Sequence, residues 1–313
     1  MNHLFTVFTP THNRAHLIHK LYESLKRQTY KDFVWLVVDD GSSDNTKDII
    51  NGFIEEGVIE ILYHFIPNGF LYLAERYSAT VLDSQYIVRI DDDDWLTDDC
   101  LEIYFNEWGK IEQEGINDIG EIRALSIRED GSIPGNYRII LNSNHIDTTF
   151  REHQLEGKSL ENNACRKAEV WKRLFYEDDI NQWLFEKVNY VSDSIMWFRL
   201  SEICRTRYIF VPVRVYYDNP VSIMHKNLSN KEQHYYNHVY NGYMMLNEFH
   251  KYFFISPKFF MFYLCAFGVS GIMLNLSYSQ LYSAITSKLI KVLFIVFTPL
   301  FFLYSLKLRR KKK

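Results

Sequence analysis

Four short apolar runs, each followed by a polar turn, set the main constraint on how the first part of this chain can fold. They occupy residues 4–8, 33–38, 59–65 and 86–90, and helical spacing of apolar residues appears at 16–28 and 70–82. The run FVWLVV contains no polar residue, which is typical of a parallel strand buried on both faces. Strands that alternate with helices predict an α/β fold, with right-handed crossovers and a mostly parallel sheet covered by helices on both faces.

Two acidic clusters follow two of these predicted strands. Asp39 and Asp40 come after the run at 33–38, and four consecutive aspartates, 91–94, come after the run at 86–90. Ligands of open parallel sheets gather at the carboxyl ends of the strands, so both clusters should lie on one rim. Neighbouring carboxylates repel, and a chain that keeps four together beside a buried strand normally offsets them with a cation or solvent. A metal site is therefore favoured over a pair of solvated turns.

Composition and charge narrow the classes of protein that the chain can belong to. With 313 residues, 47% hydrophobic and 16% aromatic, it can bury a full core. The formal net charge is −4, and subtracting the +8 carried after residue 287 leaves −12 for the body. An acidic body argues against nucleic-acid binding. A basic tail that follows an apolar run favours an anionic membrane surface on the cytoplasmic side.

The cysteines and the N-terminus bear on the compartment. Four cysteines occur, at 100, 165, 204 and 265, and they form no CxxC pair, so neither a zinc site nor a disulfide framework is predicted. The N-terminal MNHLFTVFTPTHNR lacks the charged start and long apolar core of a signal peptide. We expect the body to stay in a reducing compartment, at the cytoplasmic face of the cell membrane.

Three motifs in a fixed order carry a family resemblance. With FTPTHNRAHLIHKLYESLKRQTYKDF, then VWLVVDDGSSDNT, then YIVRIDDDDWL, the chain resembles glycosyltransferase family 2, whose fold is the Rossmann-like GT-A type. The resemblance is close over residues 4–100 and looser to about residue 225. It implies transfer of a sugar from a nucleotide-diphospho-sugar, with a uridine-diphosphate sugar as the expected donor, in bacterial cell-surface polysaccharide synthesis.

The resemblance also implies which residues bind the donor. The loop TPTHNR matches the family's opening loop beside the nucleotide base and ribose, and Asp39 matches an aspartate that accepts a hydrogen bond from uracil. The DxD pair falls on Asp91 and Asp93, and Asp92 takes the middle position, which faces the ribose in some members. The residues expected to bind the nucleotide-sugar are Thr9, Pro10, Thr11, Asn13, Arg14, Asp39, Asp40, Asp91 and Asp92.

A divalent cation, Mg²⁺ or Mn²⁺, is the cofactor that this resemblance implies. A diphosphate leaving group gains negative charge as its bond to the sugar breaks, and a hard cation held by carboxylates neutralises it. Asp93 is the expected direct ligand, together with Asp91. His225, in NPVSIMHK, matches a further ligand found in many GT-A enzymes, although an ordinary loop histidine explains it equally well.

An inverting transfer also needs a base for the acceptor hydroxyl. In the family this is an acidic residue that opens a late helix, and SDSIMWFRL places Asp193 there, with Ser192 in place of the usual glutamate. A plain helix cap is the alternative role for Asp193. The acidic run at 177–179 is a rival location. The chain departs from the family at 74–76, which reads Ala-Glu-Arg where Ala-Arg-Asn is usual, and at 160–170, where a glycine-rich acceptor loop is expected.

Two uncharged or nearly uncharged stretches of eighteen residues, 259–276 and 289–306, precede the basic end. Eighteen helical residues rise about 27 Å, which is marginally enough to cross a bilayer. They predict either a two-pass hairpin with both ends in the cytoplasm or a pair of helices lying in the membrane interface. The predicted organisation is a GT-A domain at 1–225, divided at residue 110 into donor and acceptor halves, a connecting helix at 226–252 and a membrane-associating hairpin at 253–313.

Membrane attachment favours a lipid-linked or glycan acceptor. Two alternatives stay open. A polyprenyl-phosphate glycosyltransferase would use the lipid phosphate itself as acceptor and would need no strong base. A catalytically silent relative would bind nucleotide or organise a membrane assembly without turnover.

Overall fold

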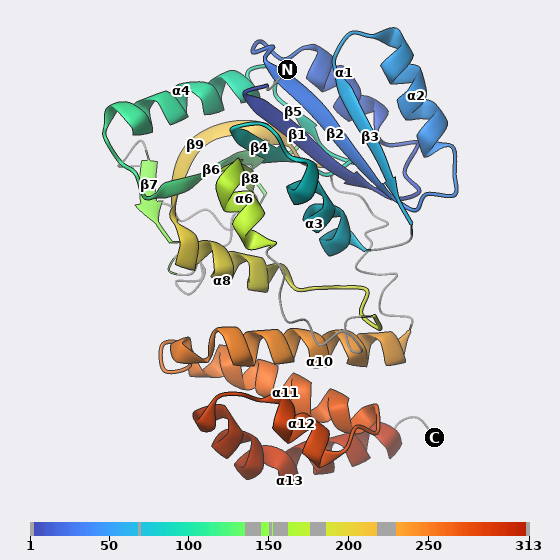
Figure 1. Cartoon of the computed structure of the whole chain (residues 1–313), viewed down its shortest axis with the longest axis vertical. Coiled ribbons are helices and arrows are strands. Elements are labelled where there is room, and N and C mark those ends of the chain that lie inside the picture. Colours follow the sequence, from blue (N-terminus) through green and yellow to red (C-terminus); the bar gives the residue numbers. More distant parts are fainter. Residues whose placement is uncertain are drawn as a thin grey trace. The chain divides into compact units, whose positions relative to one another are not determined.

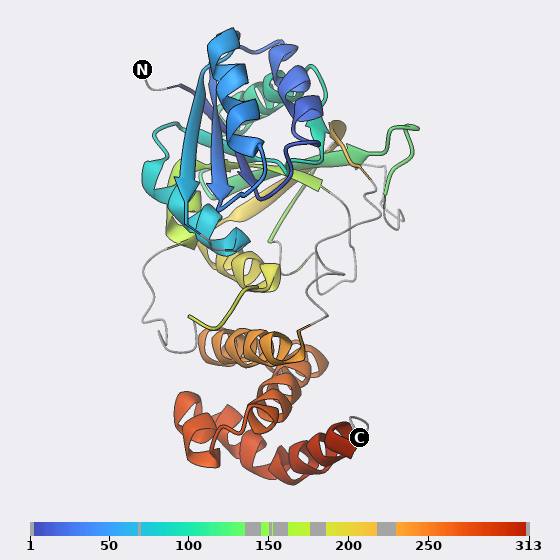
Figure 2. The same ribbon diagram turned by 90° about the vertical axis from the view of Figure 1, so that its right-hand side faces the viewer.

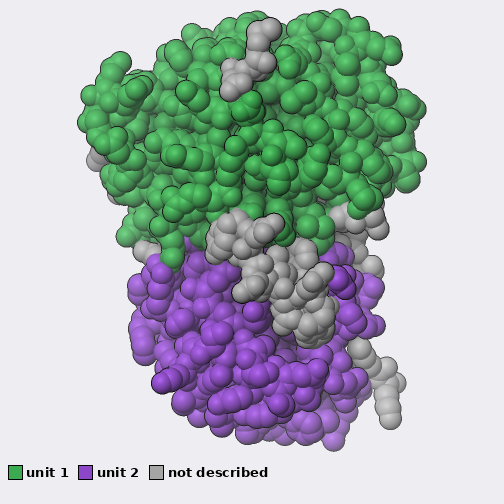
Figure 3. Space-filling view, viewed as in Figure 1, with its two compact units in different colours: residues 1–176, 199–220 green, residues 177–198, 221–313 purple. Residues whose placement is uncertain are grey.

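The computed structural model (Figures 1 and 2) describes residues 3–67, 70–134, 145–149, 152, 162–175, 186–217 and 230–310. The chain divides into two compact units, coloured separately in Figure 3. The first comprises residues 1–176 and 199–220, and the second comprises residues 177–198 and 221–313.

The described secondary structure is as follows. The strands are β1 (Phe5–Thr11), β2 (Phe33–Asp40), β3 (Ile61–Ile66), β4 (Tyr86–Arg89), β5 (Trp95–Leu96), β6 (Ile119–Ile127), β7 (His145–Thr148), β8 (Asn162–Lys167) and β9 (Arg205–Val215). The helices are α1 (His19–Lys26), α2 (Thr46–Glu56), α3 (Leu71–Val81), α4 (Cys100–Gln113), α6 (Ala168–Leu174), α8 (Asp193–Ile203), α10 (Lys231–Glu248), the 3-10 turn η1 (His250–Tyr252), α11 (Pro257–Met273), α12 (Tyr278–Ala284) and α13 (Lys288–Arg310).

One sheet organises the first unit, in the order β3-β2-β1-β4-β8-β6-β9-β5, with β7 paired to β9. Strands β1 to β4 are mutually parallel, β8 runs antiparallel between β4 and β6, and β6 and β9 are parallel. Only β5, β7 and β8 run against the other described strands. The predicted α/β fold with a mostly parallel sheet is therefore confirmed.

Strands β1 and β2 extend beyond the apolar runs that predicted them. The pairing of β1 with β4 ends at Phe8 and Arg89, and the carbonyl of Phe8 accepts from the N–H of Ile90 at 3.0 Å. The backbone of Pro10 faces the β4 side of β1, as that of Phe8 does, but it lies beyond the end of β4. The N–H that proline lacks would therefore have had no partner in β4, and no hydrogen bond of the sheet is lost. Placing residues 9–11 in a loop was wrong, and Asp39 and Asp40 are the last residues of β2 rather than the first after it.

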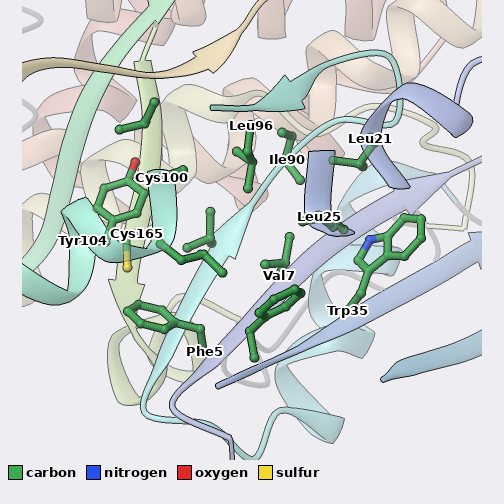
Figure 4. Close-up of a cluster of buried hydrophobic side chains, with 14 of the residues drawn as sticks. Phe5, Val7, Leu21, Leu25, Trp35, Ile90, Leu96, Cys100, Tyr104 and Cys165 are labelled. Carbon is green, nitrogen blue, oxygen red and sulfur yellow. The ribbon is translucent and has the colours of Figure 1, made fainter. Parts of the chain in front are cut away.

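The main hydrophobic core lies between the sheet and α1, α2 and α4 (Figure 4). Phe5 and Val7 of β1 and Trp35 of β2 point into it, because alternate residues of a strand face the same side. On the opposite face Phe8 lies beside Trp171 of α6, with ring centroids 5.9 Å apart. Helices thus cover both faces, and the rim with the carboxyl ends of β1, β2 and β4 is left for polar residues.

Strand β8 corrects the prediction that residues 160–170 form an acceptor loop. Its sequence is polar, but its polar side chains have partners inside the protein. Asn163 receives a hydrogen bond from the Tyr104 hydroxyl at 2.9 Å and donates to the carbonyl of Arg89 at 2.8 Å. Arg166 forms an ion pair with Glu121 of β6. These interactions join β8 to both neighbouring strands, and no local pattern in the sequence shows them.

In the second unit, helices α10, α11 and α13 pack in succession (Figures 1 and 2). Close packing depends on glycines: a Cβ at Gly242 of α10 would lie 2.7 Å from the Cβ of Phe267, and one at Gly268 of α11 would overlap the Phe301 ring of α13. Helix α11 covers most of the first predicted apolar stretch but ends before Asn275, whose φ is 58°. Asparagine tolerates this left-handed conformation, which terminates the helix.

Candidate active site

The opening loop is fastened to the loop after β2 by Asn13. Its φ of 53° lies in the left-handed region that asparagine adopts more readily than most residues. Its side-chain oxygen accepts from the N–H groups of Ser43 at 2.7 Å and Asp44 at 3.2 Å. The ring of His12 lies 2.6 Å from the main-chain oxygen of Asp40. The two loops therefore form one unit at the rim of the sheet.

Asp39, the predicted uracil acceptor, is fully buried and already holds two hydrogen bonds. One carboxylate oxygen accepts from the N–H of Ser42 at 2.8 Å, and the other accepts from the Tyr63 hydroxyl at 2.7 Å. Burial, together with the adjacent Asp39 carboxylate, raises the pKa of Tyr63, so this hydroxyl stays a donor. Thr9 faces the core, where its hydroxyl accepts from the Trp35 indole at 3.0 Å.

Each of the four aspartates at 91–94 forms an ion pair with an arginine. The arginines come from separate segments: the opening loop, the end of β4 and β9. The pairs are Asp91 with Arg89, Asp92 and Asp93 with Arg14, and Asp94 with Arg214. Sequence reasoning predicted a counter-cation but missed Arg89 and Arg214, although an arginine beside the apolar residues of each strand was a visible signal.

Arg14 bridges the two central aspartates. Its Nη1 lies 3.1 Å from Asp92 Oδ1 and 2.5 Å from Asp93 Oδ2. The hydroxyl of Thr11 donates to the other oxygen of Asp92 at 2.7 Å. Burial raises the pKa of Asp92 to about 7, against the opposing effects of Arg14 and Thr11. The three predicted donor-site residues Thr11, Arg14 and Asp92 thus belong to one hydrogen-bonded group.

Asp91 belongs to a second charged chain. Arg89 lies between Asp91, at 3.0 Å, and Glu75 of α3, whose carboxylate accepts from Arg89 Nε at 2.8 Å. Burial by itself would raise the pKa of Asp91, but Arg89 and Arg214 outweigh it and lower that pKa. Glu75 is one of the positions where the sequence departs from the family, and here it fixes the arginine that faces Asp91.

Asp94 connects the acidic loop to β9. Its buried carboxylate lies 3.2 Å from Arg214 Nη1 and accepts from the N–H of Tyr217 at 2.9 Å. Arg214 also donates to the Ser126 hydroxyl at 2.8 Å. Burial raises the pKa of Asp94 to about 7, with Arg214 opposing it. Asp94 therefore anchors the loop to the sheet.

The chemistry of this donor set fits a divalent cation that is only partly held by protein. Oxygens of Asp92 and Asp93 converge on one point, which Arg14 Nη1 takes in this structure. No cluster of three or more histidine, cysteine or acidic side chains with metal-binding geometry occurs among the described residues. Mg²⁺ commonly uses one or two carboxylates and completes its shell with water and substrate phosphates. His225 lies outside the described residues.

The predicted base, Asp193, belongs to the second unit and is the first residue of α8. The preceding Ser192 is held by Asn241 of α10, whose side-chain oxygen accepts from the Ser192 N–H at 2.7 Å. Burial first, and then the nearby Asp193 carboxylate, raise the pKa of Tyr190. The start of α8 is thus fixed by α10, and the rival acidic run at 177–179 lies outside the described residues.

The sheet order and the acidic rim define a class of protein, the GT-A glycosyltransferases. The model of the family described as glycosyl transferase family 2 matches residues 6–202, and the chain belongs to that family. In structure it is similar to S. aureus TarS 1-349, solved in complex with UDP-GlcNAc, with a TM-score of 0.59 and 16% identity over 93% of this chain and 85% of that one. That likeness establishes the fold, and the family membership makes the protein a glycosyltransferase.

Curated relatives share shorter regions with this chain. Glycosyltransferase GlyA of Streptococcus pneumoniae is 31% identical over 33% of this chain, which spans only 14% of that protein. A β-1,3-glucosyltransferase of Campylobacter jejuni, named for GalNAc(5)-diNAcBac-PP-undecaprenol, is 26% identical over 55% of this chain and 60% of its own length. Escherichia coli WfaP, named as a UDP-Glc:α-D-GlcNAc-diphosphoundecaprenol β-1,3-glucosyltransferase, is 29% identical over 34% of this chain and 43% of its own length.

Proposed function

We propose that this protein is an inverting, metal-dependent glycosyltransferase that moves a sugar from a uridine-diphosphate sugar to a lipid-linked or glycan acceptor. The observation that carries the proposal is the convergence of Asp92 and Asp93 on one cationic position at the carboxyl rim of β1, β2 and β4. The names of the C. jejuni and E. coli relatives, which specify diphosphoundecaprenol-type acceptors, support a lipid-linked substrate.

The roles of the donor-site residues follow from their contacts. Asp92 and Asp93 would hold Mg²⁺ or Mn²⁺, which supplies charge neutralisation to the departing diphosphate. The ligand role that was expected for Asp91 passes to Asp92, because the oxygens of Asp92 and Asp93 are the ones that converge on one point. Asp91 forms an ion pair with Arg89, and this pair fixes the backbone that carries the neighbouring Asp92. Asp39 offers remaining lone pairs to a uracil N–H, while Tyr63 and Ser42 keep its carboxylate oriented. The surface on which base and ribose would lie is shaped in this proposal by Asn13, in the loop after β1, and by Pro10 and Asp40, near the ends of β1 and β2.

Asp193 is proposed as the base that removes the proton from the acceptor hydroxyl. Such a base contributes when its carboxylate meets the hydroxyl opposite the leaving group, and inversion at the anomeric carbon follows from that single displacement. Its position in the first turn of α8 suits a carboxylate, because the helix dipole favours negative charge there. His225 is retained in this proposal as a further metal ligand.

Helix α13 is proposed to attach the enzyme to the cytoplasmic face of the membrane. Among the described helices it is the one long and apolar enough to span a bilayer, with a mean hydropathy of 2.2 over its most apolar window and 22% of that window buried. One side packs on α11, and the other side exposes apolar residues: Val292, Ile295, Val296, Leu300, Phe302, Leu303 and Leu306. Basic residues flank this surface. Both the two-pass hairpin and the interfacial arrangement use it.

Calorimetric titration of uridine diphosphate into the detergent-solubilised protein, with and without Mn²⁺, tests the proposal. Wild type should bind in a Mn²⁺-dependent manner, and Asp93→Asn should lose that dependence. Asp118→Asn is the matched control, since Asp118 forms an exposed ion pair with Arg205 and should leave binding unchanged. Wild-type protein that binds neither uridine diphosphate nor other nucleotides would contradict the proposal and favour the silent relative.

A further inference from the structure

We propose that Arg14 occupies the cation position between Asp92 and Asp93 until the donor arrives, and that it is then displaced by the metal and turns to the donor diphosphate. This inference rests on the proposed function and adds a specific role for one residue. Arg14 is a positioning residue in the donor-free protein and a phosphate ligand in the loaded one.

The first step of the argument is geometric. One nitrogen of Arg14 contacts oxygens from two different aspartates, at 3.1 Å and 2.5 Å. The Arg14 side chain is only 14% exposed, and those of Asp92 and Asp93 are 6% and 17% exposed. Carboxylates this poorly hydrated are costly without a nearby positive charge. The guanidinium therefore does for the donor-free site what a dication would do for the loaded one.

The second step separates Arg14 from the other arginines of the cluster. Arg89 lies on β4 and is also held by Glu75, and Arg214 lies on β9 and is also held by Ser126. Arg14 lies in the loop between β1 and α1. Within the described parts of the chain, its side chain bonds only to Asp92 and Asp93. Arg14 is thus the arginine of this cluster that can move without breaking a second interaction.

The third step concerns charge. A dication and the Arg14 guanidinium cannot both lie within a few ångströms of the same two carboxylates, because the two positive charges repel strongly at low dielectric. Metal binding alone would leave Arg14 without a partner. A diphosphate supplies one, since the planar guanidinium fork matches phosphate oxygens and can bind them bidentately. Metal and diphosphate should therefore bind cooperatively, with Arg14 as the group that couples them.

The experiment measures Mn²⁺ alone. Free Mn²⁺ is followed by electron paramagnetic resonance during titration of the full-length, detergent-solubilised protein without nucleotide. Arg14→Met should bind Mn²⁺ more tightly than wild type, by about 5- to 150-fold, which is the usual range of coupling between two sites. Arg89→Met removes the same charge nearby and is the matched control, for which a smaller gain is expected.

A second titration adds uridine diphosphate. It should tighten Mn²⁺ binding in wild type by a larger factor than in Arg14→Met. Arg14→Gln carries the same expectations if the methionine variant does not fold, as judged by circular dichroism. Unchanged or weaker Mn²⁺ binding by the Arg14 variants would overturn the inference, and so would equal gains in the Arg14 and Arg89 variants.

Failure of the inference is distinguishable from failure of the proposed function. If the wild type binds Mn²⁺ but no nucleotide, the proposed donor is wrong, yet the comparison of Arg14→Met with wild type still decides the role of Arg14. If nucleotide binds with Mn²⁺ in wild type and the Arg14 variants match it in nucleotide-free Mn²⁺ affinity, the proposed function stands and the role of Arg14 is refuted.

Discussion

The two units differ in how they accommodate their most unusual segments, which are the four consecutive aspartates of the first unit and the apolar helix α13 of the second. In the first unit, four consecutive aspartates are paired with three arginines within the protein. Arg14 and Arg214 come from distant positions in the sequence, and Arg89 lies two residues before Asp91. In the second unit, α13 is covered on one side and leaves an apolar side exposed. A buried charge is costly unless another group of the same fold pairs with it. An exposed apolar surface can instead be covered by a binding partner outside the chain. The first unit thus pairs its concentrated charge internally, whereas the second leaves an apolar surface exposed.

The largest expected effect tests the proposed catalytic base, Asp193. Asp193→Asn should lower the turnover number by about 10²- to 10⁴-fold, the usual contribution of a general base, while leaving uridine diphosphate affinity unchanged. Turnover with the labelled donor sugar and calorimetry with uridine diphosphate measure the two quantities. Asp118→Asn, on the surface of the first unit, should alter neither.

Full turnover in Asp193→Asn would show that no strong base is needed. That outcome would favour the polyprenyl-phosphate alternative, in which the acceptor is already an anion.

The next prediction tests the internal pairing of the aspartates. Arg214→Met leaves the buried Asp94 without its guanidinium and should lower the free energy of unfolding by about 3–5 kcal/mol, the usual cost of breaking a buried ion pair. Urea denaturation followed by circular dichroism measures it. Arg205→Met, which breaks an exposed pair with Asp118, should cost only about 0–1 kcal/mol. Equal losses in the two variants would refute the comparison of buried with exposed charge.

Packing within the second unit predicts a smaller loss. A methyl group at Gly268 would overlap the Phe301 ring, so Gly268→Ala should separate α11 from α13 and cost about 1–3 kcal/mol. Gly109, inside α4, has no atom within 4 Å of an added Cβ, and Gly109→Ala should stabilise by about 0.5–1 kcal/mol. Thermal unfolding of both variants provides the measurement. A gain of stability in Gly268→Ala would show that the two helices are not packed at this glycine.

The last prediction concerns membrane binding by the exposed face of α13, which leaves the fold itself unchanged. Replacing Lys307 and Arg310 by glutamine should weaken binding to vesicles of anionic lipid by about 2 kcal/mol, at about 1 kcal/mol for each basic residue near the surface. Co-sedimentation with vesicles measures this, and the difference between variant and wild type should shrink at high salt. Binding to neutral vesicles should hardly change. Loss of binding to both vesicle types would point instead to a damaged second unit.

Local patterns were enough to predict the parallel half of the sheet. Apolar runs such as 33–38 mark strands buried on both faces, and the helical spacing at 70–82 corresponds to α3. They failed at β8, which lies where the family resemblance implied an acceptor loop. Asn163 and Arg166 are buried in β8 only because Tyr104, Arg89 and Glu121 are there to pair with them. Such pairings join residues far apart in the chain and leave no periodic signal.

The sequence by itself determined the order of strands and helices from β1 to β4, the family, and the location of the aspartates at the end of β4, since each depends on residues close together along the chain. The tertiary structure decided which cation faces each aspartate. Arg14 and Arg214 meet the acidic loop because β1, β4 and β9 belong to one sheet. A buried carboxylate selects its partner by distance in space, and only the folded chain sets that distance.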